Sequence, residues 1–209
     1  MDIAKQIIDQ RVNKILNDNP ELFSDVDQER KRSKAFLLLG VAAYLDIDIA
    51  EAVQFITDGG NDGGFDAAYI AEAQDSQLNV VLFQSKYSRK LENESNFPAN
   101  AVEKAVNTVK CVFDPEATIQ LNEKSREKVD EIRSFILDGH IPYVTFVMLN
   151  NGLKCNQDGQ NHIDNAFARQ EQVHFVHYSH KNIMEYINRS VPIKTQLDFS
   201  GKAIQEDFN

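Results

Sequence analysis

The chain has 209 residues, of which 42% are hydrophobic and 26% charged, and its 22 basic and 32 acidic residues give a formal net charge of −10. This composition is that of an ordinary globular domain. The longest apolar run, residues 35–45, is shorter than the roughly 20 residues of a membrane-spanning helix, and the first residues lack the pattern of a secretory signal. We therefore expect a cytoplasmic protein with no membrane partner.

Three helices are predicted before the first strand. Residues 2–17 carry Ile and Val at helical spacing, which indicates an amphipathic helix. A second helix is predicted over 28–45, and its apolar second half should be buried. Asp48 and Glu51 form an acidic capping box ahead of a short helix that ends near Ile56.

A glycine-rich segment and a hairpin follow these helices. Residues 57–66 read TDGGNDGGFD, and four glycines within six positions allow the backbone to approach a neighbour closely. The ranges 67–73 and 79–87 are predicted as strands. The connection at 74–78 is short, so the two strands should be antiparallel, with the start of one beside the end of the other.

The second half of the chain alternates helices with strands. Helices are predicted over 98–113, with Pro98 as the first helical residue, and over 122–137, capped by Asn122. The remaining elements are a strand at 141–149, a turn at 150–152, a helix at 159–170, a strand at 172–178 and a helix at 181–188. This order predicts an α/β protein in which helices flank a mixed sheet.

One main domain is expected. Residues 1–45 are predicted to be an N-terminal helical lead-in packed on the core, and residues 46–190 should form the α/β domain. Residues 191–209 carry little pattern and are expected to be a tail or the start of a further region.

The negative charge is concentrated in one quarter of the chain. No Lys or Arg occurs between Lys34 and Lys86, whereas this segment holds eight of the 32 acidic residues. It would attract a divalent cation if its carboxylates converge. The rest of the chain is nearly neutral, so tight binding to nucleic acid would need a metal ion, a second subunit or further sequence.

Chemically useful side chains should meet at one end of the hairpin. Asp66 begins the first strand, and Gln84, Ser85 and Lys86 end the second, where alternation points Gln84 and Lys86 to the same face. The Asp66 carboxylate, the Gln84 oxygen and the Ser85 backbone carbonyl are hard ligands of the kind that Mg²⁺ or Mn²⁺ accepts. Lys86 could hold or deprotonate an attacking water and offset the charge of a pentavalent transition state.

Two more acidic residues are candidate metal ligands. Glu51 could ligate the metal or serve only as the capping partner of Asp48. Asp62 lies in the glycine-rich segment, which either positions ligands or is simply a tight connection between a helix and a strand.

These residues resemble a known nuclease signature. Asp66 followed by Gln84-Ser85-Lys86 is similar to the PD-(D/E)XK motif in its Q-x-K variant, found in Mrr-like restriction enzymes. The strings ITDGGNDGGFDAAY (56–69) and VVLFQSKY (80–87) more closely resemble the N-terminal domain of the AIPR family, bacterial proteins of phage resistance by abortive infection. The resemblance implies a restriction-endonuclease-like fold, with Asp66 as metal ligand, Gln84 in place of the usual acidic ligand and Lys86 as the catalytic lysine.

The motif and the resemblance together predict a metal-dependent endonuclease that hydrolyses DNA phosphodiester bonds in bacterial phage defence. The alternatives are a ribonuclease with the same site and a catalytically silent module that binds nucleic acid or a partner protein. Tyr87, Arg89 and Lys90 are candidate contacts to nucleic-acid phosphates. Because one site cuts one strand, double-strand cleavage would favour a homodimer.

Overall fold

The computed structural model describes residues 3–24, 27–57, 59, 62–71, 76–88, 95–114 and 116–190. Its elements, in which η marks a 3-10 helix, are α1 (Ile3–Asp18), η1 (Pro20–Phe23), α2 (Gln28–Leu45), α3 (Ile49–Ala52), η2 (Val53–Phe55), β1 (Ala67–Ile70), β2 (Gln77–Lys86), α4 (Ala99–Phe113), α5 (Glu123–Leu137), β3 (Ile141–Asn150), α6 (Gln157–Phe167), β4 (Val173–Tyr178) and α7 (His180–Ser190). The expected tail at 191–209 lies outside the described residues.

The four strands form one mixed sheet in the order β1-β2-β3-β4. β1 and β2 are antiparallel, with Ala67 opposite Phe83, which confirms the predicted hairpin. β2 and β3 are parallel, as are β3 and β4. Helices connect each parallel pair, because the chain must return to the other end of the sheet before it can continue in the same direction.

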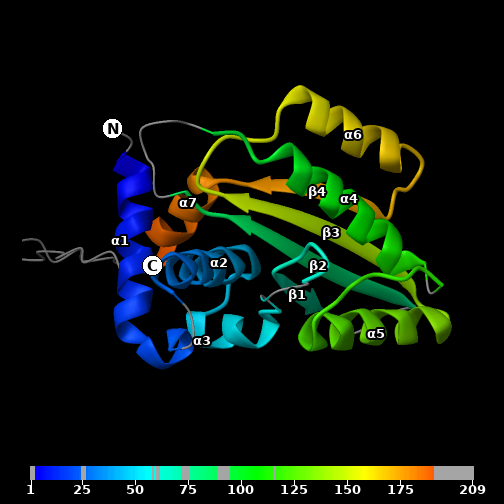
Figure 1. Ribbon diagram of the computed structural model, residues 1–209, viewed down its shortest axis with the longest axis horizontal. Coiled ribbons are helices and arrows are strands. Elements are labelled where there is room, and N and C mark those ends of the chain that lie inside the picture. Colours follow the sequence, from blue (N-terminus) through cyan, green and yellow to red (C-terminus); the bar gives the residue numbers. More distant parts are fainter. Residues whose placement is uncertain are drawn as a thin grey trace, which may run out of the picture.

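Helices cover both faces of this sheet, which confirms the predicted mixed α/β architecture (Figure 1). α1, α2, α3 and α7 share a core with Phe83 and Leu149, whereas α4, α5 and α6 share another with Leu82 and Phe146. Because side chains alternate along a strand, even-numbered residues of β2 and β3 face the α4 layer. None of the helices in the described ranges is both long and apolar enough to cross a membrane.

α2 forms the centre of one helical layer. Every residue in its stretch 35–43 is buried, in agreement with the predicted burial of the apolar half. The Asp27 carboxylate caps the helix by accepting from two backbone amides of the first turn. A Cβ added at Gly40 would lie only 2.1 Å from Leu149 Cδ2, so glycine allows α2 to approach β3 closely.

Replacing Gly40 with valine is expected to lower the free energy of unfolding by about 2 kcal/mol, because the added carbons would overlap Leu149 and overpacking a core costs about 1–3 kcal/mol. Urea unfolding followed by circular dichroism measures the effect. Ala50→Val, at an exposed position of α3, is the control, with an expected loss of about 0.5 kcal/mol from helix propensity. Equal losses in the two variants would contradict the close packing inferred at Gly40.

Several element boundaries differ from the predicted ones. Pro98 is the N-cap of α4, with φ −63° and ψ 135°, and is not its first helical residue. β2 starts at Gln77, inside the predicted turn, because it pairs there with Ile141 of β3. α6 starts two residues early because the Asn156 side chain caps it, whereas Asn122 caps α5 as predicted.

Candidate functional site

Asp66 lies beside the end of β2. Its backbone amide donates to the Phe83 carbonyl at 2.6 Å, and its carboxylate Oδ2 accepts from the Ser85 amide at 2.6 Å. Its own carbonyl accepts from the Thr57 amide at 3.0 Å, which ties the start of β1 to the end of the preceding helical segment. The structure therefore brings the Asp66 carboxylate to the Gln84-Ser85-Lys86 segment.

Gln84 contributes a buried oxygen that lacks a partner. The residue is 3% exposed, and within the described part of the chain its Oε1 accepts no hydrogen bond. Since Ala67 lies opposite Phe83, the antiparallel register puts Asp66 opposite Gln84. An unsatisfied buried acceptor costs about 1–3 kcal/mol, and a cation beside this oxygen would remove that cost.

The donors at this corner of the sheet suit a magnesium ion. Mg²⁺ is commonly held by one or two carboxylates, with water and substrate phosphate as its other ligands. Among the described residues, no group of three or more His, Cys, Asp or Glu side chains is arranged to bind a metal. A metal ion here would therefore depend on mixed donors: the Asp66 carboxylate, the Gln84 amide oxygen and the Ser85 carbonyl.

Lys86 is the last residue of β2 and is exposed. Alternation along the strand places its side chain on the same face as Gln84. No ion pair or hydrogen bond joins its ammonium to another of the residues that the structure describes. The charge is thus available to an anionic ligand.

The glycine-rich segment packs against α4. Asp62 Oδ1 accepts from the Gly64 amide at 2.8 Å and from Lys104 Nζ at 2.9 Å. Gly63 and Gly64 are buried and have φ angles of 72° and 99°, and Thr108 of α4 donates its hydroxyl to the Gly63 carbonyl. The structure thus gives the Asp62 carboxylate a partner in Lys104, and Gly63 and Gly64 allow a tight contact with α4.

The other described acids of the acidic segment serve the ends of helices. The Asp48 carboxylate accepts from the Glu51 amide at 2.7 Å, which is the predicted cap of α3, and the Glu51 side chain is exposed. Asp46 ends α2 in a left-handed conformation with φ 56°. Asp58, Glu72 and Asp75, which also belong to this segment, lie outside the described residues. The described acids do not converge on one cation.

Tyr87 anchors α1 to the sheet. Its hydroxyl donates to Asp9 of α1, whose Oδ1 also lies 3.2 Å from Arg32 Nη1. Its ring centroid lies 5.2 Å from that of Phe36. Burial, followed by the hydrogen bond to Asp9, raises the pKa of Tyr87 to about 12. The Tyr87 hydroxyl is thus held beside α1 and α2, and its contact with nucleic-acid phosphate stays a prediction.

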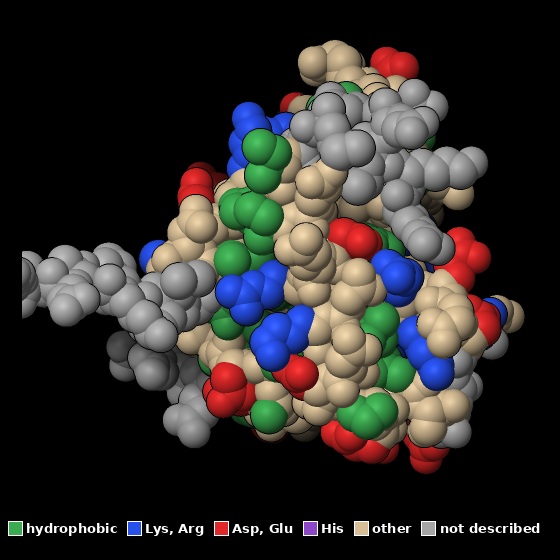
Figure 2. Space-filling model, turned by 90° about the vertical axis from the view of Figure 1, so that its left-hand side faces the viewer, with side chains coloured by type: hydrophobic (Ala, Val, Ile, Leu, Met, Phe, Trp, Pro, Cys, Tyr) green, Lys and Arg blue, Asp and Glu red, His purple; other side chains and the backbone are tan. Residues whose placement is uncertain are grey.

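Arg89 and Lys90, the other two residues predicted to contact nucleic-acid phosphates, lie outside the described residues. On the α1 end of the molecule, Figure 2 shows Lys and Arg side chains mixed with Asp and Glu. Along α1, Lys14 and Asp18 form an ion pair at 2.7 Å. The described part of this face therefore presents no continuous basic surface for nucleic acid.

High pH is expected to weaken the Tyr87 anchor. The pKa is about 10 in an unfolded chain and about 12 in the folded protein, so the folded state favours the neutral phenol. The stability that this group contributes is complete below about pH 10 and is lost as the pH rises towards about 12. Between those values, the melting temperature of Tyr87→Phe should fall less steeply than that of the wild type, and parallel curves would contradict the assignment.

A cysteine and a histidine meet next to β4, a pairing that the sequence did not indicate. Cys155 Sγ lies 3.2 Å from His177 Nε2. Burial raises the pKa of the Cys155 thiol and lowers the pKa of His177. Both shifts favour the neutral forms of the two side chains. His174, the second residue of β4, is exposed.

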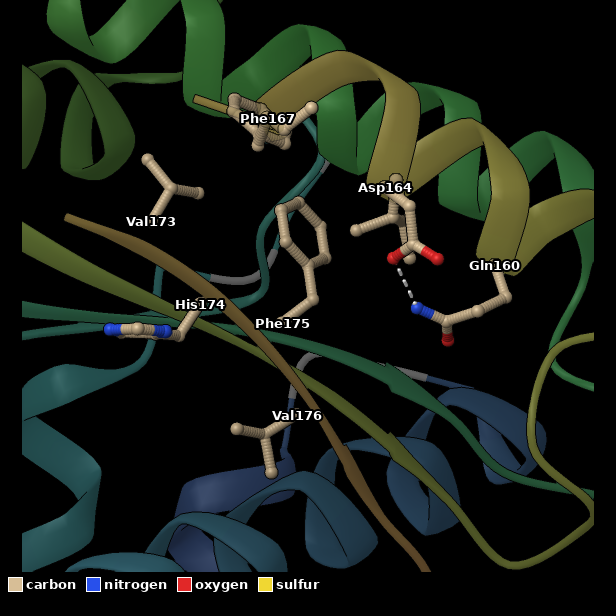
Figure 3. A pocket seen from close by; sticks show the side chains of 9 residues that line it. Gln160, Asp164, Phe167, Val173, His174, Phe175 and Val176 are labelled. Carbon is tan, nitrogen blue, oxygen red and sulfur yellow. Dashed lines mark hydrogen bonds between the residues drawn. The ribbon is translucent and has the colours of Figure 1, made fainter. Parts of the chain in front are cut away.

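A cleft of about 540 Å³ lies between α6 and β4, at the sheet edge opposite β1 (Figure 3). Phe167 and Phe175 stack within it, with ring centroids 5.4 Å apart, and Gln160 Nε2 donates to Asp164 Oδ1 at 2.8 Å along α6. None of the predicted site residues that the structure describes lines this cleft.

Asn150 is a site candidate that the sequence prediction missed. It ends β3 opposite Lys86, is 3% exposed, and has a buried Oδ1 without a partner among the described residues. The available signal was an amide residue directly after the apolar run 146–149. From the sequence, Asn150 is predicted to start the turn at 150–152.

Comparison with known proteins identified no relative: no protein-family model, curated protein or solved structure matches the chain. Any functional assignment therefore depends on the geometry of the site and on the motif resemblance.

Proposed function

We propose that this chain is a metal-dependent endonuclease domain of the restriction-endonuclease-like PD-(D/E)XK class, similar to the N-terminal domain of AIPR proteins and acting on DNA in bacterial phage defence. The observation that carries the proposal is the 2.6 Å hydrogen bond from the Ser85 amide to Asp66 Oδ2. It holds a carboxylate on the strand opposite Gln84, whose oxygen has no partner among the described residues, at the end of the strand that carries Lys86. A mixed sheet between two helical layers is consistent with this class of fold.

Each residue of the site has a distinct role in this proposal. Asp66, the Gln84 oxygen and the Ser85 carbonyl hold Mg²⁺ or Mn²⁺, which when bound polarises the scissile phosphate and lowers the pKa of water. The Lys86 ammonium orients the attacking water and stabilises the charge that develops on the phosphoryl oxygens. Because Gln84 supplies an oxygen without a charge, we expect weaker metal binding than at a site with two carboxylates.

Incubation with supercoiled plasmid and Mg²⁺ or Mn²⁺ tests the proposal. Nicked and linear DNA should accumulate with metal present and should be absent after addition of a chelator. Labelled RNA in the same assay distinguishes the ribonuclease alternative. Calorimetric titration with Mn²⁺ completes the test, since a protein that neither binds the metal nor cuts either nucleic acid would be the silent module. Sedimentation with and without DNA shows whether a homodimer forms.

A further inference from the structure

The last residues of β2 and β3 lie side by side. In the parallel register Lys86 is opposite Asn150, and Gln84 is opposite Met148. Neighbouring strands are about 4.8 Å apart, and even-numbered residues on both of them face the α4 layer. The Lys86 and Asn150 side chains therefore begin as neighbours on the face that carries Gln84.

The amide group of Asn150 is held in a fixed orientation. Its Nδ2 donates to the Leu153 carbonyl at 2.6 Å, and the same carbonyl accepts from the Phe97 amide at 3.1 Å. The Leu153 amide donates to the Ser95 carbonyl at 3.0 Å, so the turn after β3 is tied to the segment before α4. Fixing Nδ2 also fixes the direction of Oδ1, which is buried and without a partner in the described part of the chain.

The next residue, Asn151, provides a contrast. Its Oδ1 accepts from the Ser88 amide at 2.9 Å, and its Nδ2 donates to the Ser88 carbonyl at 2.7 Å. Both ends of that amide are satisfied by backbone, which is a purely structural arrangement. In Asn150 only Nδ2 bonds to the backbone, and Oδ1 has no partner among the described residues.

We infer that Asn150 positions the catalytic lysine: the structure shows no bond between the two, and a change of rotamer of the exposed Lys86 side chain brings its ammonium to donate to Asn150 Oδ1. A buried acceptor requires a donor, and Lys86 lies directly opposite with three N–H groups and a side chain long enough to turn back. Lys104 of α4 is not that donor, because its ammonium is already paired with Asp62. The catalytic consequence rests on the proposed function, because Asn150 acts only through Lys86.

Nuclear magnetic resonance of protein labelled with ¹⁵N-lysine tests this contact without any need for cleavage. An ammonium held by a hydrogen bond exchanges slowly enough to give a ¹H–¹⁵N signal, which Lys86→Arg assigns. The signal should be present in the wild type, lost in Asn150→Ala and retained in Asn150→Asp, because a carboxylate still accepts. Asn151→Ala, which removes two hydrogen bonds of the same turn, should retain the signal.

The aspartate variant separates positioning from a structural role. Asn150→Asp loses the donor to Leu153, so a purely structural Asn150 predicts that the aspartate and alanine variants behave alike. Circular dichroism establishes that each variant is folded. A signal that persists in folded Asn150→Ala, or one that disappears equally from both folded variants, would overturn the inference.

Cleavage assays extend the test. Asn150→Ala should lower kcat about tenfold with KM unchanged. This is the effect expected when a residue that only positions a catalytic group is lost. The Asn150→Ala/Lys86→Ala double variant should lose no more activity than Lys86→Ala, because both changes remove the same interaction. A Lys86 signal that depends on Asn150 in a protein without cleavage would contradict the proposed function and leave the contact established.

Discussion

Lys86→Ala is expected to lower metal-dependent DNA cleavage by about 10²- to 10³-fold, the usual effect of removing one group that stabilises developing charge. The thermal unfolding temperature should stay close to that of the wild type, because Lys86 is exposed and makes no ion pair with the other described residues. Steady-state cleavage of a labelled duplex measures the first quantity, and circular dichroism measures the second.

Lys104→Ala is the matched control for that variant. Lys104 is also partly exposed, but its ammonium is paired with Asp62 at 2.9 Å on the glycine-rich segment. Loss of such a surface pair changes stability by about 0–1 kcal/mol and should leave cleavage unchanged. If Lys86→Ala cuts DNA as fast as the wild type and Lys104→Ala, the assignment of Lys86 as the catalytic lysine is wrong.

Asp66→Asn is expected to weaken Mn²⁺ binding by at least about 100-fold, because loss of a direct ligand exceeds the 10- to 100-fold effect of losing an outer one. The variant should still fold, since the asparagine oxygen can accept the hydrogen bond from the Ser85 amide. Isothermal titration calorimetry measures the affinity. Wild-type affinity in this variant would remove Asp66 from the metal site.

Two further variants decide the remaining candidate ligands. Asp62→Asn and Glu51→Gln should bind Mn²⁺ as the wild type does, because the Asp62 carboxylate is paired with Lys104 and the Glu51 side chain is exposed on α3. A tenfold or greater loss of Mn²⁺ affinity in Asp62→Asn would extend the metal site into the glycine-rich segment.

Local signals explain which parts of the fold were predictable. Asn122 and Asp48 form the predicted caps because capping bonds span only two or three residues. The short connection before β2 made the hairpin antiparallel, so the meeting of Asp66 with the end of β2 could be expected from sequence. Alternation along β2 likewise predicts that Tyr87 lies on the face opposite that of Lys86, where it packs against the core of α1 and α2.

Features that depend on distant pairing were not predictable. Asn150 lies beside Lys86 only because β2 and β3 are parallel in one particular register, and no local pattern specifies that register. The contact of Gly64 with Thr108 likewise joins a loop to a helix far along the chain. For the same reason, the glycines indicated a close approach but not its partner.

The topology of the mixed sheet also implies that the two parts of the proposed site form at different times during folding. The bond between Asp66 and Ser85 closes within a local hairpin, whereas Asn150 reaches Lys86 only after the whole α4–α5 crossover has formed. Closing the longer loop carries the larger entropic cost, and contacts of high sequence separation form more slowly. A chain emerging from the ribosome would therefore assemble the proposed metal-binding half first and acquire the proposed acceptor for Lys86 only when the third strand is in place.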